Sequence, residues 1–343
     1  MNLDPEFCRK RQQRLAAELA ALKLDRAVLT MPEHVQYFTG FRPHKLMSAI
    51  VAVEADGSTT LVAPNDEPEG HAADRCVTFV AQHLCTLRQE MRSEAWKALG
   101  EAERAGDDEK IRETLWKLRR RKDPDELAMM RKAIDCTTAM YERAREIIEP
   151  GISELEVFNQ LHAAAVRVAG EPLTDLGNDY QVCSPGGPPR NGVVAKDGDL
   201  YILDLGPAYR GYYADNCRTF SVNRKPTDQQ LLAWERCVAV LDHVETTVKP
   251  GVRCAELFAT AKGMLDEFAP DAFYHHLGHG VGLYPHETPH LNPNWDDVFE
   301  EGDVFTAEPG LYTKELQAGI RLEQNYRVTT NGVDRLTSFP LTL

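Results

Sequence analysis

Four carboxylates and one imidazole stand in otherwise apolar segments in the second half of this 343-residue chain. Three of these segments are rich in aliphatic and aromatic residues, a pattern typical of buried strands. A carboxylate in such a strand loses its hydration and must be paired with a cation. Only one arginine, Arg321, lies within those segments, so the sequence predicts bound divalent metal. The five residues are Asp204, Asp215, His279, Glu308 and Glu323.

The spacing of the first two acids supports a pair of metal ions. Asp204 and Asp215 are separated by a turn-rich stretch, residues 206–211, and a hairpin there would place both carboxylates on adjacent strands. Like charges so close repel unless cations lie between them, which two metals about 3.5–4 Å apart would satisfy. His279 lies among glycines that permit close backbone approach. One imidazole in an oxygen-rich set suits Mn(II), Fe(II), Co(II) or Zn(II).

The composition restricts the binding partners and the cellular compartment that we expect for this protein. The net charge of −14 argues against binding to nucleic acid or to an anionic membrane, because such proteins normally present a basic face. The N-terminal residues lack the order of a signal peptide, and no segment approaches the roughly 18 apolar residues of a membrane helix. The cysteines are scattered without a CxxC pair. We therefore expect a cytoplasmic protein with reduced thiols.

The pattern along the chain predicts two domains, residues 1–120 and 121–343. A helical period at 11–24 and strand-like runs at 26–30, 49–53 and 60–63 indicate an α/β unit without a catalytic cluster. The strongly charged stretch 106–125 is interpreted as the connection between the domains. A long helix is predicted over 125–148, followed later by strands at 200–205, 213–222, 303–307 and 319–327.

A short internal repeat marks the second domain. Pro150-Gly151 and Pro250-Gly251 are each followed by a glutamate and a Phe-containing helical pattern, at an offset of one hundred residues. A repeated helix, Pro-Gly, helix unit indicates two similar halves facing each other, although Pro-Gly is also a common helix stop.

Several segments together resemble the pita-bread metallopeptidases. They are Asp204-Leu-Gly, Gly211 to Thr219, Gly278-His279-Gly-Val-Gly282, Thr306-Ala-Glu308-Pro-Gly310 and Ile320-Arg-Leu-Glu323. The likeness runs from about Glu126 to the C-terminus and extends more weakly to residues 33–41. It implies an α+β protein, with a small creatinase-type α/β domain preceding a pseudo-symmetric pita-bread domain.

The resemblance implies roles for individual residues. All five metal-ligand positions of the family are retained, which disfavours a metal-free creatinase, and the N-terminal domain favours the proline-directed branch. His286 matches a histidine that contacts the substrate and stabilises the tetrahedral intermediate. His275, Tyr312 and Arg321 match residues of the proline pocket. Two structural alternatives stay open: Tyr312 as plain core, and Arg321 as a counter-ion for Glu323.

Two departures from the family pattern bear on activity. Proline-directed members usually carry a histidine in the loop before the first aspartate ligand, but no histidine occurs between His162 and His243. Asn191 is the nearest replacement in that region. His276 and Pro285 also stand where the family usually has a small or polar residue and a β-branched one.

We therefore expect a dinuclear exopeptidase that hydrolyses Xaa-Pro bonds through a metal-activated bridging water, with Glu308 as the proton shuttle. The expected cofactors are two divalent ions, manganese first, with cobalt, zinc or iron as alternatives. Proline-containing peptides are the expected partners, and the resemblance suggests a homodimer. The sequence leaves open a dipeptidase or an aminopeptidase on longer peptides. A catalytically silent peptide-binding module and a creatinase-like amidinohydrolase are the alternatives.

Overall fold

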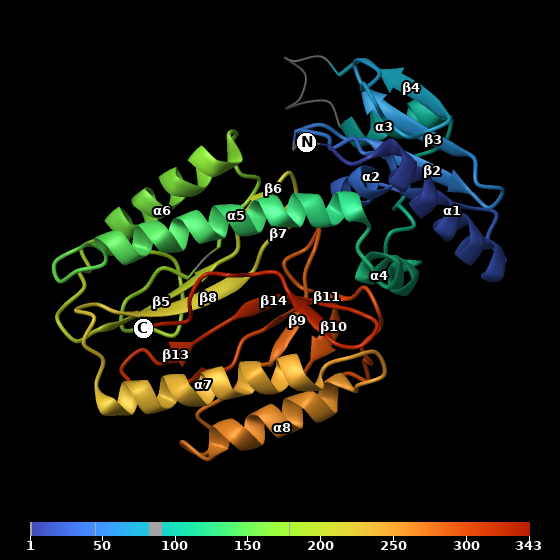
Figure 1. Ribbon diagram of the computed structural model, residues 1–343. Helices are drawn as coiled ribbons and strands as arrows, with labels where there is room; N and C mark the ends of the chain where they lie inside the picture. Colours follow the sequence, from blue (N-terminus) through green and yellow to red (C-terminus); the bar gives the residue numbers. More distant parts are fainter. Residues whose placement is uncertain (1, 45, 82–90, 178) are drawn as a thin grey trace. The chain divides into compact units, whose positions relative to one another are not determined.

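The computed structural model describes residues 2–44, 46–81, 91–177 and 179–343 (Figure 1). The chain divides into two compact units, Met1–Arg119 and Arg120–Leu343. No helix within the described ranges is both long and apolar enough to cross a membrane.

The N-terminal unit is built on a four-stranded sheet in the order β1-β2-β3-β4, antiparallel except for the parallel pair β3 and β4. The predicted first helix is confirmed but begins earlier, because Asp4 caps it by accepting the Glu6 N–H at 2.8 Å. The three predicted strands are also confirmed. The elements are α1 (Pro5–Ala21), β1 (Arg26–Leu29), α2 (Pro32–Thr39), β2 (Ile50–Glu54), β3 (Thr59–Pro64), β4 (Arg75–Phe79), α3 (Met91–Leu99) and α4 (Arg112–Arg120).

The charged stretch at 106–125 contains α4 and is not simply a solvated segment. Arg119 and Lys122 are buried. Lys122 forms an ion pair with Glu287 at 2.8 Å in which both side chains are almost fully buried. This ion pair connects Glu287, which directly follows His286, to the segment that precedes α5 (Pro124–Ile147).

The C-terminal unit places short strands between two pairs of helices (Figure 1). One pair is α5 and α6, and the other is α7 and α8. The elements after α5 are α6 (Glu154–Ala169), β5 (Leu200–Leu205), β6 (Ala208–Tyr209), β7 (Tyr212–Tyr213), β8 (Asn216–Ser221), α7 (Asp228–Thr247), α8 (Cys254–Asp266), β9 (Gly278–Gly280), β10 (Glu287–Leu291), β11 (Val304–Ala307), β12 (Gly310–Leu311), β13 (Ile320–Arg321), β14 (Gln324–Val328) and β15 (Val333–Arg335).

The predicted repeat is confirmed in backbone detail. Gly151 and Gly251 follow α5 and α7, with φ of 98° and 93°. The N–H of Gly151 donates to Ala195 O at 2.8 Å, and that of Gly251 donates to Phe299 O at 2.9 Å. Each helix pair is thus joined by the same left-handed turn, anchored on a backbone carbonyl of its own half.

The strands that hold the predicted ligands differ in part from the sequence prediction. The strand at 200–205 is confirmed as β5, and the strand at 303–307 corresponds to β11. The predicted strand 213–222 was too long, because β7 ends at Tyr213 and β8 begins at Asn216, which leaves Asp215 between them. The predicted strand 319–327 is interrupted at Leu322 and Glu323, between β13 and β14.

The turn geometry gives a matched pair of glycine substitutions. Gly251→Ala forces an L-residue into a left-handed conformation, and we expect it to cost about 1–2 kcal/mol of unfolding free energy. Gly263 lies in α8, where an added Cβ would meet no atom within 4 Å, so Gly263→Ala should add about 0.5–1 kcal/mol. Denaturant unfolding of both variants tests this. Equal effects of the two changes would contradict it.

Candidate metal centre

The two aspartates of the first half lie on facing ends of one strand pair. Asp204 is in β5 opposite Cys217 of β8, and Asp215 directly precedes β8. The backbone of Asp215 is held by Asn325, whose side-chain amide donates to Asp215 O. The predicted proximity of these carboxylates is therefore produced by the antiparallel β5–β8 pairing, with β6 and β7 forming the connection.

His279 enters from the second half on β9, between β10 and β11. Its Nδ1 lies 2.9 Å from Gly280 O and donates to it in the neutral ring. That bond leaves Nε2 as the free nitrogen. Nε2 lies 3.7 Å from Asp215 Oδ2 and 3.6 Å from Glu308 Oε1. Burial lowers the pKa of His279 to about 3, so the ring is in the neutral form that binds metal.

The two glutamates are fixed through their backbones. The Glu308 N–H donates to Leu277 O at 2.7 Å, directly after β11. The Glu323 N–H donates to Cys217 O at 3.0 Å, so this residue is bonded to β8 of the other half. Arg218, which is fully buried in β8, also donates to Glu323 O at 2.6 Å. The two halves thus meet at the acidic residues.

All five residues line one cavity of about 470 Å³. His275, His286 and Arg321 line it as well. Tyr312 is linked to this group through His275 Nε2, 2.9 Å from its hydroxyl. Every site residue predicted from the sequence is therefore in or beside one cavity. The lining residues that were not predicted as part of the site are Asp179, Pro185, Gly186, Tyr274 and His276.

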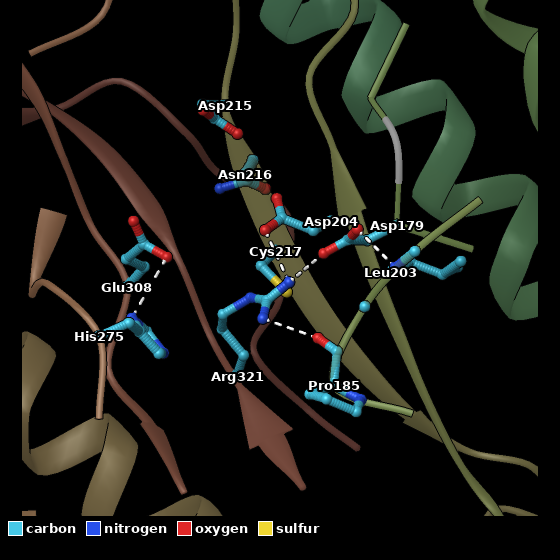
Figure 2. Close-up of polar contacts among 12 residues, drawn as sticks. Asp179, Pro185, Leu203, Asp204, Asp215, Asn216, Cys217, His275, Glu308 and Arg321 are labelled. Carbon is cyan, nitrogen blue, oxygen red and sulfur yellow. Dashed lines mark hydrogen bonds and ion pairs between the residues drawn. The ribbon is translucent and has the colours of Figure 1, made fainter. Parts of the chain in front are cut away.

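Arg321 is the only arginine or lysine among the described residues that line the cavity. Its Nη2 lies 2.9 Å from Asp204 Oδ2 and 2.6 Å from Asp179 Oδ2. Its Nη1 donates to Pro185 O and to the Tyr312 hydroxyl. Figure 2 shows the Arg321 guanidinium between Asp204, Asp179 and Pro185. The ion pairs of Arg321 are with Asp179 and Asp204, and Glu323 is affected by its charge only at longer range.

Burial and, after it, the neighbouring charges raise the pKa of three acids. Burial is the main cause for Asp204, and it raises the pKa of that carboxyl to about 6 although Arg321 opposes the shift. Burial and then repulsion by Asp204 and Glu308 raise the pKa of Asp215 well above its ordinary value. Burial and then the charges of Asp215 and Asp204 do the same for the pKa of Glu323. One arginine does not balance this group.

Glu308 differs from the other three acids. Its Oε1 lies 2.8 Å from His276 Nε2. Burial acts to raise the pKa of Glu308, but the hydrogen bond and charge of His276 outweigh it, and the pKa is lowered to about 2. The contact with His276 therefore keeps the Glu308 carboxylate in its charged form.

The donor set fits divalent metal. Asp204 Oδ1 and Glu323 Oε2 are buried and have no hydrogen-bond partner among the described residues. Ligand atoms of His279, Glu308 and Glu323 lie within 4.8 Å of one another, as do those of Asp215, His279 and His286. Buried oxygens without donors, beside a neutral imidazole with a free nitrogen, are what a cation of this type requires.

His286 lines the metal-centre cavity, whereas Asn191 does not. His286 is exposed and its ring stacks on His279, with centroids 3.8 Å apart. Asn191 is exposed and is not among the residues that line the cavity, so it does not replace the missing loop histidine. Gly186 lines the cavity there instead, packed so closely on Asp179 that a Cβ would displace the carboxylate.

The fold and the site together define a two-part peptidase of the creatinase and pita-bread type. Residues 128–330 match the model of metallopeptidase family M24, and residues 11–147 match that of the creatinase/prolidase N-terminal domain. The chain therefore belongs to metallopeptidase family M24 and is a metal-dependent peptidase. The expected fold class, an α+β protein with these two parts, is confirmed.

Relatives and solved structures agree with this assignment. The Xaa-Pro dipeptidase of Pyrococcus furiosus is 28% identical over 96% of this chain and 98% of its own length. The putative dipeptidase YkvY of Bacillus subtilis is 32% identical over 66% of this chain, and the match spans 63% of that relative. The structure of the Pyrococcus furiosus prolidase superposes with a TM-score of 0.79 at 26% identity, over 95% of this chain and 99% of that one. A variant of Escherichia coli aminopeptidase P, at 20% identity, shares the fold with a TM-score of 0.76 over 98% and 96% of the chains.

The repulsion among the cavity acids, and their binding of metal, can be tested by thermal unfolding without a substrate. Asp215→Asn replaces a partly buried acid that Asp204 and Glu308 repel, so we expect the thermal midpoint of metal-free protein to rise, by about 2–4 °C per kcal/mol of relieved repulsion. The same change should abolish most of the further rise that Mn(II) gives the unchanged protein. Asp197→Asn, at an exposed acid outside the cavity, is the control. A lower midpoint for metal-free Asp215→Asn, with an undiminished Mn(II) response, would refute the site.

Proposed function

We propose that this metallopeptidase is a dinuclear exopeptidase that cleaves Xaa-Pro peptide bonds. The observation that carries the proposal is the convergence of four carboxylates and the Nε2 of His279 on one cavity, which has a single arginine among its described lining residues. The prolidase and Xaa-Pro dipeptidase names of the relatives support the choice of substrate. The ligands would be Asp204, Asp215, His279, Glu308 and Glu323, with manganese as the expected ion.

The bound cations would lower the pKa of a water molecule and polarise the scissile carbonyl. The protein's part is to supply and orient the groups around that centre. Asp204 is held by Arg321, and His279 by its Nδ1 bond to Gly280. These contacts fix the donor atoms before a substrate arrives, which removes the cost of reorganising them during the reaction.

Glu308 is the proposed proton shuttle. It would accept a proton from the attacking water and deliver it to the leaving prolyl nitrogen. Its pKa is lowered chiefly by the contact with His276, so the carboxylate is ionised at neutral pH. His286, exposed and stacked on His279, is proposed to contact the substrate and stabilise the tetrahedral intermediate.

A proline substrate explains the group formed by His275, Tyr312 and Arg321. Prolyl nitrogen carries no N–H in the peptide and its ring fixes φ, so recognition cannot rely on an extended-strand hydrogen bond at that residue. His275 Nε2 and Arg321 Nη1 both contact the Tyr312 hydroxyl, at 2.9 and 3.1 Å. Because both side chains are held by this one hydroxyl, the three form a pre-organised surface on which the ring is proposed to rest.

The experiment loads metal-stripped protein with Mn(II) or Co(II) and assays Gly-Pro and a longer Xaa-Pro peptide. Metal-dependent release of the first amino acid is expected. Tight metal binding without turnover of either peptide would favour the catalytically silent peptide-binding module. Turnover untouched by chelators would favour an amidinohydrolase-like reaction and contradict the proposal.

The shuttle role of Glu308 predicts a large loss of rate. Glu308→Gln keeps the size of the side chain but cannot accept a proton, so kcat should fall by at least about 100-fold while the protein folds normally. Metal content of the variant is measured alongside, because this residue is also a proposed ligand. Glu315→Gln, at an exposed glutamate outside the cavity, is the matched control. Retained activity in metal-loaded Glu308→Gln would remove this residue as the shuttle.

A further inference from the structure

A second cavity, of about 550 Å³, adjoins the metal-centre cavity. The two share one wall, formed by Tyr274, His275 and His276. The far side of the second cavity comes from α8, through Phe258 and Lys262, and from the segment 292–294 that follows β10. His275, a residue of the proposed proline surface, therefore faces both spaces.

The floor and the shared wall of this second cavity are aromatic. The rings of Phe258 and Phe273 lie 5.9 Å apart, and Phe273 contacts the His275 ring edge-on at 4.8 Å. Tyr274 is 65% exposed, although its ring lies only 5.0 Å from that of Tyr312. A large aromatic side chain left open between two cavities provides a surface on which an apolar ligand group can be buried.

The polar groups of the cavity suit a neutral peptide. Asn292 Oδ1 accepts the Asn294 N–H at 2.9 Å. The side-chain amide of Asn294 is exposed and can pair with a peptide backbone group. Lys262 is already neutralised by Asp266 at 2.8 Å and Asp271 at 3.1 Å. Among the described residues that line this cavity there is thus no unbalanced lysine or arginine to select a terminal carboxylate.

We propose that this cavity binds the residue that follows proline in substrates of three or more residues, and that it favours a large apolar side chain. The inference rests on the proposed Xaa-Pro hydrolysis. With the proline ring on His275, Tyr312 and Arg321, a continuing chain passes the exposed Tyr274 ring and enters the second cavity. A dipeptide leaves this space unused, so peptides with an apolar residue after the proline are the better substrates.

The test compares kcat/KM of the Mn(II)-loaded protein for Gly-Pro, Gly-Pro-Gly and Gly-Pro-Leu, with glycine release as the readout. Burial of a leucine side chain should raise kcat/KM for Gly-Pro-Leu over Gly-Pro-Gly by about tenfold or more. Asn294→Trp places a large ring in the second cavity, at a position exposed enough to leave folding intact. It should lower the ratio of Gly-Pro-Leu to Gly-Pro turnover by about tenfold.

Asn191→Trp, at an exposed asparagine that lines neither cavity, is the matched control and should leave that ratio unchanged. Equal rates for the two tripeptides, or an Asn294→Trp ratio like that of the unchanged protein, would overturn the inference. Cleavage of Gly-Pro without either tripeptide would also overturn it while Xaa-Pro hydrolysis stands. Failure to cleave any of the three peptides would instead count against the proposed function, and the inference would fall with it.

Discussion

Repulsion among the carboxylates that line one cavity is the constraint on which the rest of this structure depends. Asp204, Asp215 and Glu323 each have a pKa raised first by burial and then by charged neighbours. Arg321 is shared between Asp204 and Asp179, so it cannot neutralise the group. Folding without a cation therefore carries a cost, which the remaining contacts around the site must offset.

Those contacts come from the duplicated architecture. Each half contributes a helix pair closed by the same left-handed glycine turn, and the strands of both halves meet where the Glu323 N–H bonds Cys217 O. The buried side chain of Arg218 donates to Glu323 O and to Phe339 O. Because the acids sit on backbone segments cross-linked in this way, their side chains cannot move apart to relieve repulsion. The backbone contacts of both halves thus hold the acids close together.

Much of the site was predictable because its ligands break clear local patterns. Asp204, Glu308 and Glu323 each interrupt or end an apolar run, and residues of that kind stand out in a single sequence. Asp179, Pro185 and Gly186 gave no such signal, since they lie in irregular segments placed by long-range contacts such as the hydrogen bonds from Arg321 to Asp179 and to Pro185 O. Asn191 was a wrong replacement for the same reason: position in a loop does not reveal which residue faces the cavity. The break between β13 and β14 at Glu323 was missed because the residues on both sides favour a strand.

The central claim is that these acids cage cations, and the most direct measurement is anomalous scattering from crystals grown with excess manganese. We predict two manganese peaks in the cavity, with oxygens of Asp204, Asp215, Glu308 and Glu323 and the Nε2 of His279 as their protein ligands. Absence of manganese from the cavity, with the acids turned apart or neutralised by protonation and by Arg321 alone, would contradict the account.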